Sequence, residues 1–152
     1  MDELELEFEL HPTLQADTWE LGDFPLCRLL LMNDANYPWF ILVPRRAGVT
    51  EIYHLSASER TQLMEESAAL SETLADLFMA RKMNVAALGN MVSQLHLHHV
   101  VRYEDDVAWP GPVWGVADAR PYTQEQASEI RRKLEVLLEG ELDFKWAESA
   151  AS

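Results

Sequence analysis

Four polar residues near the middle of the sequence could together carry out phosphoryl chemistry. Gln94, His96, His98 and His99 fall within one short run of alternating polar and apolar residues. A neutral imidazole nitrogen can attack phosphorus. A protonated neighbour can offset charge on the phosphoryl oxygens or donate a proton to a leaving group. Histidine can fill either role near neutral pH, so the cluster predicts nucleophilic chemistry on a phosphate.

Two other interpretations of these histidines remain open. Histidines two residues apart on a strand can ligate zinc or another transition metal. No third strong ligand stands nearby in the sequence, and Cys27 is the one cysteine, so we expect no bound metal and no other cofactor. The histidines could also lie on a solvated strand without any chemical role. The position of His99 favours a structural histidine that faces the core.

A strand is the element that we expect to position this cluster. Residues 91–102 are predicted to form it, joined to a strand over 84–88 by a hairpin turn at Gly89–Asn90. Side chains alternate between the two faces of a strand. Gln94, His96 and His98 should therefore point to one side, while the intervening leucines and the third histidine point to the core.

The other expected elements give an α+β domain with an antiparallel sheet, a long helix and a C-terminal helix. Alternation over 3–10 predicts a half-buried strand. Ser56 and Glu59 have capping-box spacing at the start of a long helix over 56–82. Short turns between strands favour antiparallel pairing. Strands are also expected over 18–20, 26–32 and 39–43, a turn at Gly22–Asp23, a helical turn over 13–17 and a helix over 123–140.

The length and composition of the sequence are those of a small folded protein with one core. Its 152 residues are 48% hydrophobic and 25% charged, as in an ordinary globular domain. We expect a single domain over 1–147 and a disordered tail over 148–152. A lone cysteine fits a reducing compartment, and the acidic first residues do not fit a signal peptide, so the expected location is the cytoplasm.

The charge of the protein excludes two classes of partner. A formal net charge of −14, from 26 acidic and 12 basic residues, does not suit a nucleic acid polymer or an anionic membrane surface. No apolar run approaches the length that a membrane span needs. A small anionic ligand remains compatible, because a local site can be positive within a negative protein.

The run around His96 resembles the histidine triad, His-φ-His-φ-His-φ-φ with φ apolar. In this chain Gln94 stands at the first histidine position. Residues 42–46, Leu-Val-Pro-Arg-Arg, are similar to the apolar strand that ends in proline and a basic residue in that family. Gly89–Asn90 stands where the family has Gly-Gln, and the long helix lies in the expected place. The resemblance covers about residues 20 to 115.

This resemblance implies an α+β nucleotide-binding domain that usually forms a homodimer. Members hydrolyse or transfer nucleoside monophosphates from dinucleoside polyphosphates, phosphoramidates or adenylated compounds. It makes His96 the nucleophile that forms a nucleotidyl-histidine, and His98 a group that contacts the phosphate and assists charge or proton transfer. Gln94 would replace a histidine that supports the nucleophile. An amide can hydrogen-bond but cannot titrate near neutral pH.

The resemblance also implies a set of substrate contacts. Asn33 would contact the ribose, and Asn84 and Asn90 would lie near the phosphate. Arg102 could face the phosphate or a dimer partner, with an exposed ion pair as the alternative. Two further segments are open: Trp109 and Trp114 could shape the pocket or plug the core, and 104–106 is expected to be a solvated acidic turn.

Some positions depart from the family pattern. Besides Gln94 and Asn90, Met91 stands where a hydroxyl residue commonly contacts the leaving group, and Ala47 follows the basic pair where histidine is common. The nucleophile is unaffected by these changes. They leave two hypotheses: a nucleotidyl hydrolase or transferase, or a nucleotide-binding module with little turnover.

Overall fold

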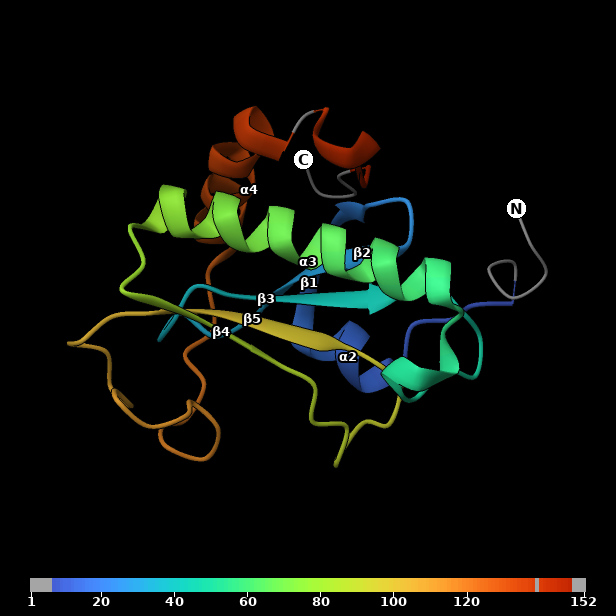
Figure 1. The fold of residues 1–152 in the computed structure, drawn as a ribbon. Helices are drawn as coiled ribbons and strands as arrows, with labels where there is room; N and C mark the ends of the chain where they lie inside the picture. The colour runs from blue at the N-terminus through green and yellow to red at the C-terminus, as the bar shows by residue number, and fades with distance from the viewer. Residues whose placement is uncertain (1–6, 139, 149–152) are drawn as a thin grey trace.

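The computed structural model describes residues 7–138 and 140–148. Within these residues a single antiparallel sheet has the strand order β4-β5-β3-β2-β1-β6 (Figure 1). Its strands are β1 Thr18–Asp23, β2 Cys27–Met32, β3 Trp39–Pro44, β4 Lys82–Ala86, β5 Leu97–Arg102 and β6 Lys145–Trp146. The α-helices are α2 Pro12–Asp17, α3 Ala57–Phe78 and α4 Gln124–Leu138, and short 3-10 helices η1 and η2 span Ile52–His54 and Glu141–Asp143. The predicted α+β class is confirmed.

The long helix α3 begins and ends for local reasons. Glu59 N–H donates to Ser56 Oγ at 3.2 Å, and Ser56 N–H donates to a Glu59 carboxylate oxygen at 2.8 Å, which completes the expected capping box. The helix stops where Met79 adopts a left-handed conformation with φ of 54°. It is therefore shorter than the predicted 56–82.

The two faces of the sheet bury different clusters. Helices α3 and α4 cover one face, where Leu70 and Leu134 pack against strand residues such as Leu29 (Figure 1). The opposite face carries a smaller cluster that includes Leu14 of α2 and Trp39. Alternate residues of each central strand enter alternate clusters, as the pleat requires.

The segment before β5 is irregular, so the predicted hairpin at Gly89–Asn90 is wrong. β4 and β5 do pair as antiparallel neighbours, but residues 87–96 form a loop between them. Leu95 N–H donates to Val49 O at 3.0 Å, so this loop packs against the segment after β3. Val92 and Leu95 of this loop are both buried, in the clusters on opposite faces of the sheet.

The N-terminal prediction also needs correction. Residues 7–10 form no strand, and the rest of the expected strand over 3–10 lies outside the described residues. Gly22 and Asp23 belong to β1 instead of a turn. A Cβ on Gly22 would clash with the carbonyl oxygen of Lys145, so glycine is needed for the close approach of β6. The predicted tail over 148–152 falls outside the described residues except for Glu148.

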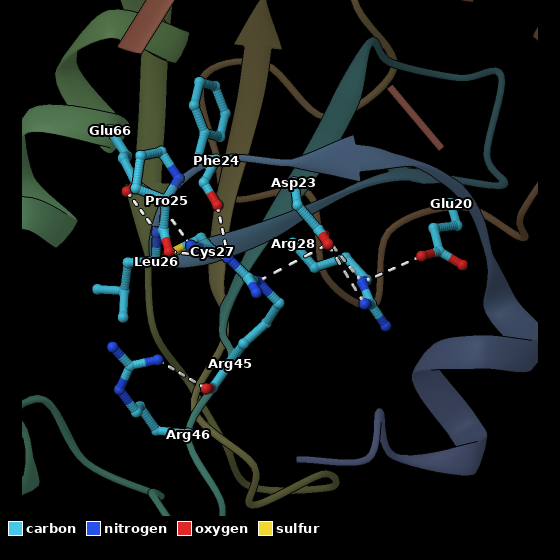
Figure 2. Close-up of polar contacts among 10 residues, drawn as sticks. All are labelled: Glu20, Asp23, Phe24, Pro25, Leu26, Cys27, Arg28, Arg45, Arg46 and Glu66. Atoms are coloured by element: carbon cyan, nitrogen blue, oxygen red, sulfur yellow. Dashed lines mark hydrogen bonds and ion pairs between the residues drawn. The ribbon is translucent and has the colours of Figure 1, made fainter. Parts of the chain in front are cut away.

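The corner after β3 is fastened to the turn between β1 and β2 (Figure 2). Arg45 Nη2 donates to the carbonyl oxygens of Phe24 and Pro25, each at 2.8 Å. The buried carboxylate of Glu66 on α3 accepts the backbone N–H groups of Leu26 and Cys27 at 2.8 and 2.9 Å. These contacts set where the chain leaves the sheet and enters η1 and α3. Across the described residues, no helix has the length and apolar character to cross a bilayer.

Candidate active site

His96 and His98 come together at the start of β5. His98 belongs to the strand and His96 immediately precedes it. Their ring centroids are 4.8 Å apart with an interplanar angle of 70°, and each residue is 6% exposed. The side-by-side placement expected for these two histidines is therefore present, although only one of them lies within a strand.

A backbone hydrogen bond sets the tautomer of His96. Nδ1 lies 2.7 Å from the carbonyl oxygen of Gln94, and because a carbonyl only accepts, Nδ1 must carry the proton. The lone pair of the neutral ring is then on Nε2. This is the arrangement that a nucleophilic imidazole requires.

His98 is held in the opposite tautomer. The indole Nε1–H of Trp39 donates to Nδ1 of His98 at 3.0 Å, so the proton of the neutral ring is on Nε2. Burial, with a smaller contribution from the neighbouring His96 and His99, lowers the pKa of His98 to about 3. His98 is therefore a neutral hydrogen-bond donor, and the expectation of a protonated histidine beside the nucleophile is wrong in this structure.

His99 faces the other side of the sheet, as predicted. Its Nδ1–H donates to Leu97 O at 3.0 Å, and its Nε2 lies 2.7 Å from Ser67 Oγ on α3. Burial lowers the pKa of His99 to about 4, so the ring is neutral and accepts the hydroxyl proton of Ser67. This contact ties β5 to the helix behind it.

A cavity of about 390 Å³ opens beside His96. One wall comes from the segment around η1 and the first turns of α3, and the other comes from the loop before β5. The side chains include acceptors, donors and a guanidinium, which suits a small polar or charged ligand. The lining residues are Thr50, Glu51, Ile52, Tyr53, Arg60, Ala87, Leu88, Gly89, Ser93, Gln94, Leu95 and His96.

The side chain of Gln94 is used to hold the N-terminal segment. Its Oε1 accepts His11 N–H at 2.9 Å, and its Nε2 donates to Glu9 O at 2.9 Å. Gln94 also contributes to a second cavity of about 600 Å³, lined by residues 8–12 and by side chains of β1 and β2. The backbone carbonyl of Gln94, and not its amide, is thus the group that supports His96.

Arg102 and Asn84 contact one another at the other end of β5. Arg102 is 1% exposed, and its Nη1 donates to Asn84 Oδ1 at 2.6 Å. Its Nε and Nη2 bond to the two Asp106 carboxylate oxygens at 2.9 and 3.1 Å, and Nη2 also donates to Gly111 O at 2.8 Å. The alternative of an exposed ion pair at Arg102 is therefore wrong, since this pair is buried. The predicted solvated turn over 104–106 is present for Glu104 and Asp105, which are exposed, and fails for Asp106.

Asp106 is ionised within this buried network. Burial acts to raise the pKa of Asp106, but Arg102 and the backbone N–H groups of Tyr103, Ala108 and Trp109 outweigh it and lower the pKa to about 2. The same contacts fix the loop that follows β5. That loop carries Trp114, whose ring centroid lies 5.1 Å from the ring of His98.

The remaining predicted contact residues lie away from the cavity wall. Asn33 Oδ1 accepts Tyr122 N–H at 2.8 Å, which fastens the segment before α4. Asn90 is exposed, and the neighbouring Met91 is 97% exposed. Other described residues line the cavity beside His96, so these asparagines are not gathered around it in this structure.

Sequence reasoning did not identify Trp39, Tyr53 or Arg60 as part of the site. Trp39 reaches His98 because β3 pairs with β5, with Ile41 opposite His98. Tyr53 and Arg60 arrive through the path of the chain after β3. No local pattern marks these residues, since each depends on a long-range contact. For the metal interpretation, no group of three histidine, cysteine, aspartate or glutamate residues able to hold an ion occurs among the described residues.

Comparison with known proteins connects this geometry to one family. Residues 13–105 match the family model of the HIT domain. None of the curated proteins compared with the sequence matches it.

Several solved structures resemble the chain along most of its length. A histidine triad protein from Marinobacter aquaeolei VT8 is 57% identical, with a TM-score of 0.85 over 88% of this chain and 97% of its own. A histidine triad protein from Bradyrhizobium japonicum is 41% identical, with a TM-score of 0.83 over 85% and 96%. One from Sinorhizobium meliloti 1021 is 37% identical, with a TM-score of 0.85 over 87% and 98%.

Proposed function

The chain belongs to the HIT domain family, and from this premise we propose that it is a nucleotidyl hydrolase or transferase in which His96 attacks phosphorus. Members of the family bind nucleotides and hydrolyse or transfer them. The substrate we propose is a nucleotide or an adenylated small molecule that enters the cavity beside His96. The net charge of −14 argues for such a ligand over a nucleic acid polymer.

The observation that carries this proposal is the hydrogen bond from His96 Nδ1–H to Gln94 O at 2.7 Å. It leaves the Nε2 lone pair free to attack and orients the ring with a rigid backbone group. In the nucleotidylated state both ring nitrogens are substituted and the ring is positive. The Gln94 carbonyl then faces the Nδ1–H of that cation and stabilises it.

The reaction follows in two steps. The Nε2 lone pair of His96 forms a bond to phosphorus, and the bond to the leaving group breaks with its electron pair. A water or another acceptor then attacks phosphorus, and the P–N pair returns to Nε2. We assign His98 to donate its Nε2–H to a phosphoryl oxygen in both steps, because Trp39 occupies its Nδ1.

For Arg102 and Asn84 we propose a structural role in place of the substrate contact that the resemblance implies. Arg102 has no exposed surface to offer, and its donors already serve Asn84, Asp106 and Gly111. The side-chain oxygen of Asn33 similarly accepts a hydrogen bond from the backbone N–H of Tyr122. We propose that these residues set the shape of the site from outside it.

A nucleotide-binding module with little turnover is the second candidate function. Met91 is 97% exposed, and its side chain offers no hydroxyl to a leaving group. The Gln94 amide is engaged with residues 9 and 11. Both candidates bind nucleotides, and only the enzyme forms a covalent intermediate.

We also propose a homodimer that joins two copies along β4. This strand is at the edge of the sheet, and Val85 and Leu88 near it are exposed large apolar residues. An edge strand with apolar side chains is a template for pairing with a second chain. Sedimentation or light scattering would distinguish the dimer from the monomer.

The experiment that tests the proposed function is incubation with a panel of adenylated compounds. Intact-mass spectrometry reads the covalent adduct, and release of the monophosphate reads turnover. We expect a nucleotidyl group on wild-type protein and none on His96→Ala. Binding without an adduct for any compound would favour the binding module.

A further inference from the structure

We propose that this site cleaves substrates whose leaving group departs as a stable anion, such as a carboxylate, a phosphate or an acidic phenol, and is a poor catalyst for amine and alkoxide leaving groups. The inference rests on the proposed function and narrows its substrate class. The proposed substrates are a narrower set than the family resemblance implies, because phosphoramidates, which have amine leaving groups, are expected to be poor substrates.

The contact between Trp39 and His98 carries the argument. An indole N–H only donates, so Nδ1 of His98 must keep its lone pair for the 3.0 Å hydrogen bond to exist. A protonated His98 would direct an N–H at the N–H of Trp39. Only the imidazolium form of histidine is an effective acid in the physiological range. His98 can therefore hold a hydrogen bond to a phosphate but has no spare proton for a leaving group.

The surroundings of His98 act in the same direction. The rings of Trp39 and Trp114 lie at 5.6 and 5.1 Å from its ring, and the residue opposite it on β3 is Ile41. On the other side its strand partner is Ala86 of β4. The titratable groups that act on it are His96 and His99, and both oppose a positive charge on His98. Among the described residues, no carboxylate interacts with His98 in a way that would favour the imidazolium.

The cavity wall supplies no alternative acid. The Glu51 side chain accepts the backbone N–H of His54. Arg60 donates to Leu55 O at 2.6 Å, and a guanidinium does not release its proton in proteins. Tyr53 is 75% exposed, and a phenol is a far weaker acid than an imidazolium. The Gln94 amide does not titrate.

The chemical step must then proceed without proton donation. The Nε2 pair of His96 bonds to phosphorus, and the P–O bond breaks with its pair on the departing oxygen, which leaves as an anion. The nucleotidyl-imidazolium keeps its proton on Nδ1, where it is hydrogen-bonded to Gln94 O. In the second step water attacks, the P–N pair returns to Nε2, and the water proton passes to solvent. An amine would have to leave as an amide anion, and the barrier to breaking the P–N bond in that way is much higher.

The test is a series of aryl esters of AMP that differ only in the acidity of the phenol, together with an AMP phosphoramidate. Single-turnover nucleotidylation should be fastest for the 4-nitrophenyl ester. We expect the phenyl ester to react on the order of 100-fold more slowly than the 4-nitrophenyl ester. The more basic phenolate needs help from a general acid, and assistance of about this size is missing here. The phosphoramidate should be slower still.

Trp39→Phe is the matched variant, since it removes the indole N–H and keeps an aromatic ring. His98 Nδ1 is then free to be protonated, so the phenyl ester should gain more than the 4-nitrophenyl ester, and the rate should rise as pH falls. Trp19→Phe is the control, because it removes a buried indole N–H of β1 that has no hydrogen-bond partner among the described residues. It should leave the dependence on leaving group unchanged.

A direct measurement covers the case in which Trp39→Phe fails to fold. Nitrogen NMR of the wild-type His98 ring should show the neutral Nε2–H tautomer down to about pH 5. Equal rates for all esters and the phosphoramidate, or a protonated His98 at neutral pH, would overturn this inference and leave the proposed function standing. No adduct with any ester would overturn the proposed function itself.

Discussion

The indole nitrogen of Trp39 lies 3.0 Å from Nδ1 of His98, and this hydrogen bond links the first residue of β3 to the second residue of β5. It fixes the ring orientation and the position of the proton at once. His96, two residues earlier, has the opposite tautomer because its Nδ1–H is held by a backbone carbonyl. The pair therefore presents one nitrogen lone pair and one N–H donor, which suits attack on a phosphate and stabilisation of its oxygens.

Replacement of His98 tests its role as a neutral donor. His98→Ala should slow nucleotidylation by roughly 10²- to 10³-fold, as loss of one preorganised donor does elsewhere. The adduct should still form on His96 at long times. Single-turnover kinetics with the 4-nitrophenyl ester measures this. A His98→Ala protein as fast as wild type would remove His98 from the mechanism.

Replacement of Gln94 separates its backbone from its side chain. Gln94→Ala keeps the carbonyl that holds His96 but loses both hydrogen bonds to residues 9 and 11. Nucleotidylation should fall by less than about tenfold, the scale of a net hydrogen bond. The amide of His11 should lose its protection from hydrogen exchange.

Gln94→Glu is the paired variant for this contact, because a carboxylate can accept from His11 N–H but cannot donate to Glu9 O. It should give partial protection of the His11 amide, between wild type and Gln94→Ala. Loss of activity comparable to that of His96→Ala in either variant would instead place the Gln94 side chain in the chemistry.

The buried pair of Arg102 and Asp106 should dominate the stability of this end of the sheet. Arg102→Met leaves Asp106 buried without its partner, which typically costs about 3 to 5 kcal/mol. Denaturant unfolding followed by tryptophan fluorescence measures the loss. Arg81→Met is the control, since its ion pair with Glu104 is exposed and should contribute less than about 1 kcal/mol.

Because Asp106 titrates differently in the folded and unfolded states, we expect the free energy of unfolding to depend on pH. The pKa of Asp106 is lowered to about 2 in the folded protein, below its ordinary value near 4. A lowered folded-state pKa stabilises the protein above the unfolded value, and this contribution is lost as pH falls from about 4 towards 2. Unfolding curves across this range should show the loss in wild type and a smaller one in Asp106→Asn.

Local pattern was enough to predict the elements whose residues interact with near neighbours. The capping box at Ser56, the strands around Leu30 and Ile41, and the proximity of His96 and His98 all follow from spacing of two or three residues. The loop over 87–96 could not be predicted, because its shape depends on Leu95 bonding to Val49 far away in the sequence.

The chemistry of the site was less predictable than its location. A charged role for His98 was a reasonable expectation from its type, but Trp39 reaches it across a strand pairing that the sequence does not display. Arg102 is likewise of a residue type that often binds phosphate, but it is buried as a core residue is. In both cases burial and a long-range partner decide the state of the group.

The covalent state of His96 tests the central claim most directly. Wild-type protein is mixed with the 4-nitrophenyl ester of AMP, quenched within one turnover and analysed by intact-mass and peptide mass spectrometry. The account predicts one added adenylyl group, located on the peptide that contains His96, and no adduct on His96→Ala that still binds AMP. An adduct on His96→Ala, or release of AMP by wild type without any adduct on His96, would contradict it.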